Sequence, residues 1–277
     1  MYIGAHVSIA GGVQNAPANA ARSGCECFQM FTRSPQGGPA PVLDPTNAGE
    51  FKMNMKKFKQ AAAYVHTPYY INLASAIDRI SRNSVRIIRE ELDRGSLLGA
   101  KALMTHIGSA SDLGRDKAMK QVVAGLKKIV AGYRGATRFL LEISAGSGNI
   151  IGDTFEEIAE LIKAVPEYDL GVCFDTCHAF VSGYDLRTKE AVGQTLTKFD
   201  RGIGLDKLVL VHANDAKFGL GSRKDRHEHI GYGTVGKEGF HSLLHHPKLK
   251  NVDFILETPP SEKGEINDVA MLKKLRT

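Results

Sequence analysis

Six consecutive apolar segments of this chain are each followed at once by a histidine, an aspartate or a glutamate. The six residues are His66, His106, Glu142, Asp175, His212 and Glu257. Imidazole and carboxylate groups are the ligands that zinc prefers in proteins, and they also suit manganese and iron. One such residue after an apolar segment is usually structural, whereas six in succession predict a shared metal site.

Three further candidates lie close to these six in the sequence. His178 follows Asp175 by three residues, and Asp225 and His227 lie in a loop over 214–236 that is rich in glycine, histidine and charge. No single ion can use nine ligands. The set therefore predicts two or three metal ions that share bridging carboxylates, an arrangement that holds both the attacking and the leaving oxygen in phosphate displacement.

The apolar segments themselves are short and are separated by helical stretches, which is typical of buried parallel strands. Eight are found, over residues 2–5, 25–31, 62–65, 102–105, 139–141, 171–174, 208–211 and 254–256. We expect helices over 50–63 and 77–98, the second stopped by Gly99, and one that opens with a capping box at Thr154.

Eight strand–helix units predict one (β/α)₈ TIM barrel domain of the xylose-isomerase-like kind over residues 1–277. A barrel of this type needs about 250 residues, so the length suits a single domain. The carboxyl ends of its strands meet at one mouth, where active sites of this fold are built. The six strand-end residues would therefore face one another.

Composition restricts the class of protein only weakly. The chain holds 36 Lys and Arg against 30 Asp and Glu, a net charge of +6 that mildly favours an anionic partner. The start has no signal-peptide pattern and no apolar stretch could span a membrane, so we expect a cytoplasmic protein that does not bind membranes. We interpret the four cysteines as reduced, with Cys25, Cys27 and Cys173 in strands.

Longer motifs around these residues resemble the endonuclease IV family of apurinic/apyrimidinic endonucleases, over nearly the whole chain. They are YIGAHVS at 2–8, Glu142 with SAGSG at 144–148, GVCFDTCHAF at 171–180, HAND at 212–215 and GSRKDRH at 221–227. The resemblance implies a DNA repair enzyme, a zinc-dependent deoxyribonuclease IV. It would hydrolyse the phosphodiester bond 5′ to an abasic site, leaving 3′-hydroxyl and 5′-deoxyribose-phosphate ends, and could also trim 3′ ends.

The resemblance also implies three Zn²⁺ ions, for which Mn²⁺ or Fe²⁺ could substitute. The first would be held by His66, His106 and Glu142. The second would be held by Glu142, Asp175, His212 and Glu257, and the third by His178, Asp225 and His227. Glu142 would be the catalytic residue that bridges two ions and positions the attacking hydroxide. Double-stranded DNA with abasic or damaged sites is the expected partner, bound by a monomer.

Two stretches depart from the family pattern. At the loop that enters DNA, the usual arginine is replaced by Gln36, which is followed by Gly37 and Gly38, and the usual aromatic residue is missing. Tyr232 stands between two glycines where the family commonly has glutamate. Tyr69 matches a position that enters the DNA gap, and Arg226, fixed between two candidate ligands, is a candidate phosphate contact.

Two other functions fit parts of the pattern. A metal-dependent sugar isomerase or epimerase on the same barrel would need only one or two ions, but the sequence places no lysine base at a strand end. A non-catalytic metal-dependent binder of damaged DNA is the third hypothesis. His178, Asp225 and His227, as ligands of a third ion, favour hydrolysis over the isomerase.

Overall fold

The computed structural model of this chain describes residues 1–111, 113–259 and 266–277. Eight parallel strands form a closed barrel, in which β1 pairs with both β2 and β10. The strands are β1 (Ile3–His6), β2 (Cys27–Met30), β3 (Ala63–His66), β4 (Ala102–Thr105), β5 (Arg138–Glu142), β6 (Gly171–Asp175), β7 (Leu208–His212) and β10 (Asp253–Leu256). The predicted TIM barrel is therefore confirmed.

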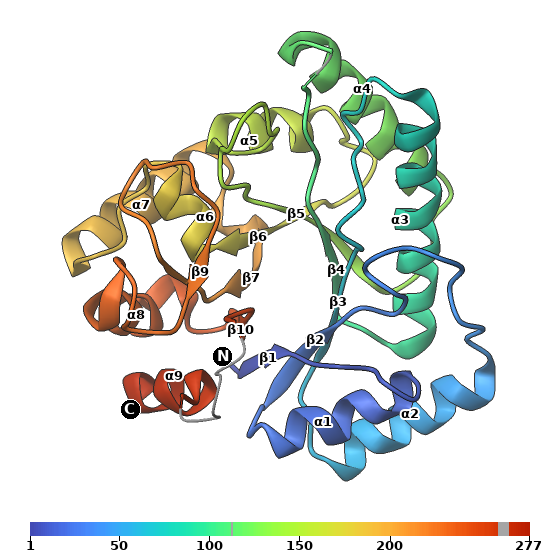
Figure 1. Cartoon of the computed structure of the whole chain (residues 1–277), viewed down its shortest axis with the longest axis horizontal. Coiled ribbons are helices and arrows are strands. Elements are labelled where there is room, and N and C mark those ends of the chain that lie inside the picture. The colour runs from blue at the N-terminus through green and yellow to red at the C-terminus, as the bar shows by residue number, and fades with distance from the viewer. Residues whose placement is uncertain (112, 260–265) are drawn as a thin grey trace.

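Helices surround this barrel, as Figure 1 shows. They are α1 (Ala16–Arg22), α2 (Pro45–Lys57), α3 (Asp78–Leu98), α4 (Arg115–Val130), α5 (Phe155–Lys163), α6 (Thr176–Val181), α7 (Lys189–Gly202), α8 (Gly236–Leu244) and α9 (Asp268–Arg276), with short 3₁₀ helices over Val13–Asn15, Leu205–Lys207 and Pro247–Leu249. As predicted, Gly99 ends α3 in the left-handed conformation. Thr154 caps α5 by accepting from the Glu157 amide.

The interior of the barrel determines which residues reach the mouth. A separate buried cluster fills it, made of Cys27, Tyr64, Ala102, Met104, Leu140, Cys173, Leu210 and Ile255. Side chains alternate between the two faces of a strand, so the residue two positions later points to the same side. Counting two residues on from seven of these interior positions gives Gln29, His66, His106, Glu142, Asp175, His212 and Glu257. Six of the seven are candidate ligands.

Several boundaries differ from the sequence-based prediction. Helix α2 begins at Pro45 rather than Glu50, because Asp44 accepts a hydrogen bond from the Asn47 amide and Pro45 suits a first helical turn. It ends at Lys57, and Lys59 has a φ of 52° that cannot continue the helix. Cys25 precedes β2 rather than lying in it. The loop over 214–236 contains a two-stranded antiparallel sheet of β8 (Asp215–Ala216) and β9 (His227–Glu228).

The two chain ends lie together at the amino-terminal end of the barrel strands. Arg276 in α9 donates hydrogen bonds to both carboxylate oxygens of Glu26, at 2.7 and 2.9 Å. The Glu26 carboxylate also accepts from the Ile3 amide of β1. These bonds fasten the last helix to the first two strands. Among the described helices, none combines the length and the apolar character that crossing a membrane requires.

Candidate metal centre

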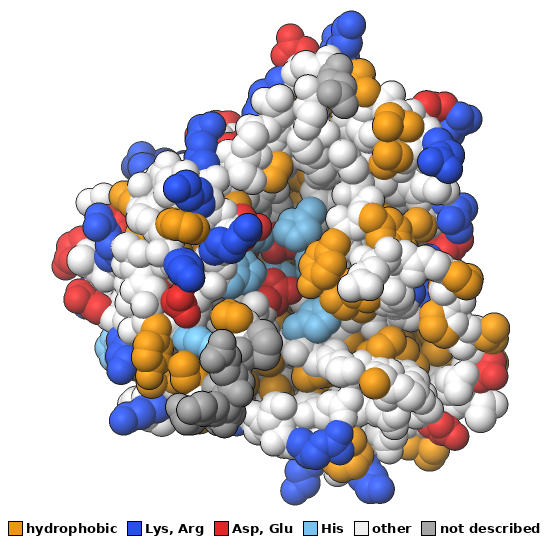
Figure 2. Space-filling model, in the orientation of Figure 1, with side chains coloured by type: hydrophobic (Ala, Val, Ile, Leu, Met, Phe, Trp, Pro, Cys, Tyr) orange, Lys and Arg blue, Asp and Glu red, His pale blue; other side chains and the backbone are white. Residues whose placement is uncertain are grey.

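All nine predicted ligand residues gather at the carboxyl-terminal mouth of the barrel. Figure 2 shows histidine and acidic side chains at the bottom of a hollow on this face, with lysine and arginine side chains on its rim. Strands β3, β5, β6 and β7 each end on one of these residues, and His106 and Glu257 follow β4 and β10 directly. His178 lies on α6 and His227 on β9, so the loop over 214–236 covers one side of the hollow.

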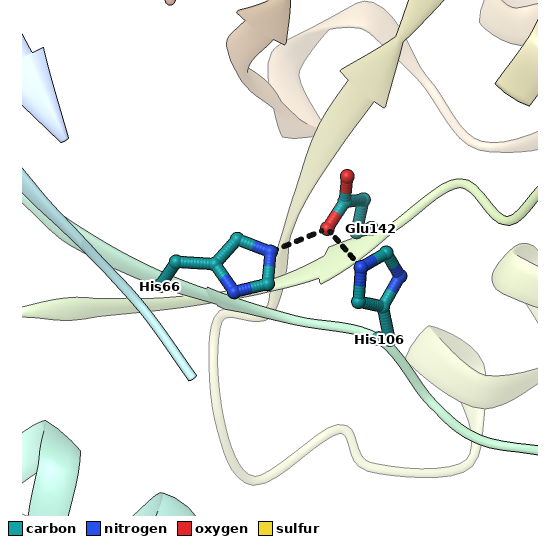
Figure 3. Close-up of side chains that lie close together, drawn as sticks. All are labelled: His66, His106 and Glu142. Atoms are coloured by element: carbon teal, nitrogen blue, oxygen red, sulfur yellow. Dashed lines mark hydrogen bonds and ion pairs between the residues drawn. The ribbon is translucent and has the colours of Figure 1, made fainter. Parts of the chain in front are cut away.

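The first group joins His66, His106 and Glu142, whose ligand atoms all lie within 4.8 Å of one another. Oε2 of Glu142 is 3.1 Å from Nε2 of His66 and 3.7 Å from Nε2 of His106. Figure 3 shows both imidazole rings pointing their nitrogens at this single oxygen. Two imidazoles and a carboxylate converging in this way leave room for one cation between them.

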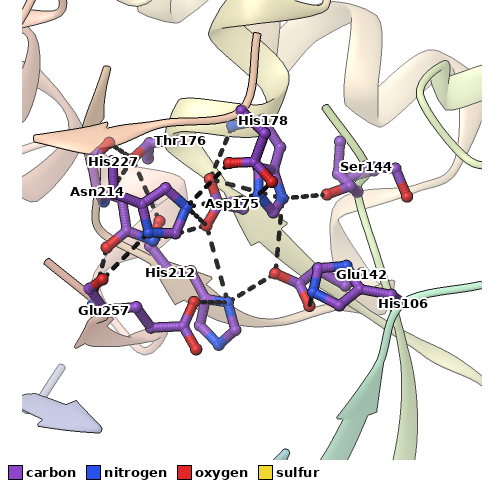
Figure 4. Close-up of polar contacts among 12 residues, drawn as sticks. His106, Glu142, Ser144, Asp175, Thr176, His178, His212, Asn214, His227 and Glu257 are labelled. Atoms are coloured by element: carbon purple, nitrogen blue, oxygen red, sulfur yellow. Dashed lines mark hydrogen bonds and ion pairs between the residues drawn. The ribbon is translucent and has the colours of Figure 1, made fainter. Parts of the chain in front are cut away.

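The second group consists of Glu142, Asp175, His212 and Glu257, again with ligand atoms within 4.8 Å of one another. Nδ1 of His212 lies 2.9 Å from Glu142 Oε1, 3.3 Å from Glu257 Oε2 and 3.9 Å from Asp175 Oδ2. Figure 4 shows these groups around one space. Glu142 belongs to both groups through different oxygens, so its position is that of a bridging carboxylate.

The third group lies towards the loop over 214–236 and joins His178, Asp225 and His227. Nε2 of His178 is 3.4 Å from Asp225 Oδ2, and Nε2 of His227 is 3.7 Å from Asp225 Oδ1. Nδ1 of His178 faces the Ile143 carbonyl at 2.9 Å and Nδ1 of His227 faces the Glu257 carbonyl at 3.1 Å. Each imidazole is thus oriented by the backbone, with Nε2 directed at the group.

The four carboxylates carry a large negative charge that the protein does not balance with strong bases. Among the described residues, the ion-pair partners of Glu142, Asp175, Asp225 and Glu257 are all histidines, and none is a lysine or an arginine. Glu142 and Asp175 are fully buried. Because buried charges need compensation, this donor set fits divalent cations.

The pKa shifts of the acids and histidines reflect the same excess of buried negative charge. Burial by itself would raise the pKa of Glu142, but the charges of His106 and His212 outweigh it and hold this pKa well below its usual value. Burial would lower the pKa of His178, but Asp175 and Asp225 raise it to about 10. The metal-free site therefore favours ionised acids together with protonated His178 and His212, and cations would replace such protons.

Two cysteines come close to the candidate ligands. Cys173 can form a group with Glu142 and His212, and Cys177 can form one with Asp175 and His227. Burial raises the pKa of the Cys173 thiol to about 12 and raises that of Cys177 further. Because the thiolate is the form that binds metal, we assign the ligand role to the histidines and carboxylates. All four cysteines are free, in agreement with the predicted reduced state.

Of the three candidate DNA-contacting residues, Tyr69 and Arg226 lie beside the candidate ligands at the mouth. Tyr69 is 69% exposed and packs edge-on against Phe31, with ring centroids 5.1 Å apart. It lines a pocket of about 340 Å³ together with His106, His178 and Asp225. Arg226 is exposed and donates to the Asp225 carbonyl. Gln36 is also exposed, but within the described parts of the chain no contact places it against the candidate ligands.

Two buried amide side chains, which were not predicted from the sequence, contact the candidate ligands. Asn214 donates to Asp175 Oδ2 at 2.7 Å and accepts from the Glu257 amide at 2.8 Å. Gln29 on β2 contacts His212 and Glu257. Gln29 could have been singled out from the sequence, because it is a polar residue inside an apolar strand and lies two positions after the interior residue Cys27.

Comparison with known proteins identifies the fold and the relatives of this chain. Residues 17–275 match the family model described as xylose isomerase-like TIM barrel. The chain is 38% identical to the probable endonuclease 4 of Halothermothrix orenii and 38% identical to that of Cenarchaeum symbiosum, in each case over 100% of this chain and 99% of the relative.

Solved structures give a consistent result. The endonuclease IV from Thermus thermophilus is 35% identical, with a TM-score of 0.87 over 100% of this chain and 98% of that one. A D-tagatose 3-epimerase-like protein is 19% identical, with a TM-score of 0.71 over 99% of this chain and 95% of that chain. The second likeness extends to the barrel fold alone.

Proposed function

This chain belongs to the endonuclease 4 family, and from that premise we propose that it is a DNA repair endonuclease. It hydrolyses the phosphodiester bond 5′ to an abasic site, leaving 3′-hydroxyl and 5′-deoxyribose-phosphate ends. Double-stranded DNA is its partner, and we propose that a single chain, as a monomer, carries the complete site. One observation carries the proposal. Three groups of candidate ligands meet at one mouth, and Glu142 joins two of them through its two oxygens.

We propose that these groups hold three divalent ions, with zinc as the metal that suits the donors best. His66, His106 and Glu142 would hold the first ion. Glu142, Asp175, His212 and Glu257 would hold the second, and His178, Asp225 and His227 the third. Such ions would act as Lewis acids. They would lower the pKa of a bound water towards about 7 and neutralise the charge that builds on a phosphate.

The protein residues supply orientation and a dry environment. Glu142 is fully buried and its two oxygens face an imidazole nitrogen of His66 and of His212, so its carboxylate is held in one orientation. We propose Glu142 as the catalytic residue that orients the attacking water. His178 and Asp225, which belong to the third group, would lie near the departing 3′ oxygen. A phosphate bound between Glu142 and these two residues would then be contacted at the attacking oxygen and at the leaving oxygen.

Three exposed residues would contact the DNA beside this centre. Tyr69 presents an aromatic ring at the rim, where it can stack on a base or occupy the gap that a missing base leaves. Arg226 would bind a phosphate, since its guanidinium is exposed next to the third group. Gln36 would contact DNA from the loop after β2 without the charge of an arginine.

A duplex oligonucleotide with one abasic site, labelled at the 5′ end of the damaged strand, tests this proposal. We expect a single nick 5′ to the site that disappears when a chelator is added and returns with Zn²⁺. The control is the same duplex without damage, which should stay intact. A product with a 3′-unsaturated aldehyde, or nicking that persists after complete metal removal, would contradict hydrolysis by a metal centre.

A further inference from the structure

The buried amide of Gln29 lies between two residues of the second candidate metal group. Its Oε1 is 2.7 Å from Nε2 of His212, and its Nε2 donates to Glu257 Oε1 at 2.6 Å. The same Nε2 lies 3.0 Å from Nδ1 of His6 on β1. The Gln29 side chain is fully buried, so water does not compete for these bonds.

The chemistry of the neighbours determines which way the amide faces. A carboxylate can only accept hydrogen bonds, so the NH₂ end of Gln29 must face Glu257. The amide oxygen then faces His212, and Nε2 of that imidazole must carry the hydrogen. This leaves Nδ1 of His212 unprotonated in the neutral ring. Nδ1 is also the atom that faces Glu142, Glu257 and Asp175, at 2.9, 3.3 and 3.9 Å.

We propose that Gln29 is a positioning residue for the metal centre. One amide selects the His212 tautomer whose lone pair points at the second group, and it holds the Glu257 carboxylate facing the same space. A side chain that hydrogen-bonds the outer nitrogen of a ligating imidazole typically changes metal affinity by about 10- to 100-fold. The inference rests on the proposed metal centre, and Gln29 itself binds no metal in it.

The need to fill space does not explain why residue 29 is a glutamine. The interior cluster directly below Gln29 consists of apolar side chains that include Cys27, Leu210 and Ile255. If β2 needed only volume at this position, methionine would fill it without burying an amide. Burying an amide is favourable only when its polar atoms are paired. Among the residues that the structure describes, the partners of the Gln29 side-chain amide are His6, His212 and Glu257 at the mouth.

The variant Gln29→Met removes the donor and the acceptor while keeping the length of the side chain. Its matched control is Gln60→Met, which changes another buried glutamine, at the opposite end of the barrel, whose amide donates to the Cys25 and Phe58 carbonyls. Zn²⁺ affinity is measured by competition with a chromophoric chelator, without DNA. We expect Gln29→Met to weaken one class of bound Zn²⁺ by about 10- to 100-fold, and Gln60→Met to leave Zn²⁺ affinity unchanged.

A second readout begins with the unmodified protein, in which the His212 tautomer is observed directly. With ¹⁵N-labelled histidine and bound Zn²⁺, we expect a slowly exchanging Nε2–H proton on His212. That signal should shift or exchange faster in Gln29→Met and stay in place in Gln60→Met. A purely structural role would not set the tautomer of one imidazole.

The outcomes separate the two proposals. If the unmodified chain binds no Zn²⁺, the metal centre is wrong and the role of Gln29 fails with it. If it binds Zn²⁺ but His212 carries its hydrogen on Nδ1, or Gln29→Met binds as tightly as the parent, only the role of Gln29 is overturned. Weakened Zn²⁺ binding together with a displaced Nε2–H signal supports it.

Discussion

Oε1 of Glu142 lies 2.9 Å from Nδ1 of His212, although 70 residues separate them in the sequence. The closed barrel produces this contact, because β5 and β7 both pair with β6 and their carboxyl-terminal ends meet at the same mouth. The other oxygen of Glu142 faces His66, whose strand lies on the other side of β4. Glu142 therefore links candidate ligands from both sides of the mouth.

Glu142→Gln should lower the rate of abasic-site cleavage by at least about 100-fold, since it removes the charge shared by two candidate metal groups. DNA binding should be largely preserved, because Glu142 is buried away from the surface. Single-turnover cleavage and fluorescence anisotropy with the same duplex measure the two effects. Glu156→Gln, which changes an exposed glutamate of α5, is the control and should cut normally. Cleavage by Glu142→Gln at the parental rate would show that the assignment is wrong.

Removing metal should abolish cleavage and also destabilise the fold. Ions that bind only the folded chain stabilise it by about 4 kcal/mol when present at a thousand times their dissociation constant. For a chain of this size we therefore expect the melting temperature to fall by roughly 10 °C after chelation. Differential scanning calorimetry and elemental analysis of the same sample test this, with three Zn²⁺ per chain expected before chelation. A melting temperature that is the same with and without Zn²⁺ would argue against a centre made of all nine residues.

Tyr69→Ala should weaken binding to abasic DNA by about tenfold, the effect of losing one aromatic stacking surface. Tyr69→Phe keeps the ring and should bind almost as tightly as the parent. Tyr2→Ala changes an exposed tyrosine at the opposite end of the barrel and should have no effect. Equal affinity of Tyr69→Ala and the parent for the damaged duplex would place the DNA elsewhere on the surface.

Arg226→Gln should weaken binding to every duplex, damaged or intact, because a phosphate contact does not depend on the base. Loss of one contact reduces the slope of log affinity against log salt concentration by about 1. Lys250→Gln removes the same charge from an exposed position near the amino-terminal ends of the strands, and its slope should match that of the parent. If the two variants behave alike, Arg226 acts only through net charge.

Glu26→Gln should lower stability at neutral pH. The hydrogen bond from Arg276 is the main reason that the pKa of Glu26 falls from 4.5 to about 2 in the folded chain. The ionised form is thus favoured by folding, so this contribution is present above pH 4.5 and is lost as the pH falls towards 2. Because Glu26 is partly exposed, we expect about 1 kcal/mol at pH 7.

Urea unfolding of the parent and of Glu26→Gln at pH 7 and at pH 3 measures that contribution. The difference between the two proteins should shrink at the lower pH. Glu190→Gln, on the exposed first turn of α7, controls for loss of a charge. A difference that grows on acidification would reverse the sign of the proposed effect.

The sequence alone was enough to predict the barrel and the location of its mouth. Short apolar strands and intervening helices are local patterns, and a ligand residue such as His66 or Glu142 follows its strand directly in the chain. Parallel strands of a closed barrel end on one side, so local order already implied that distant residues meet. The boundaries of α2 were less certain, because they depend on the Asp44 cap and on the backbone at Lys59.

Only the tertiary structure decided how the side chains share the space. That Glu142 faces His66 with one oxygen and His212 with the other depends on the register of β5 against its neighbours, a property that no local pattern contains. The role of Gln29 has the same origin. Its type suggested no metal chemistry, and its position two residues after Cys27 gained meaning only when closure of the barrel brought β2 within reach of His212 and Glu257.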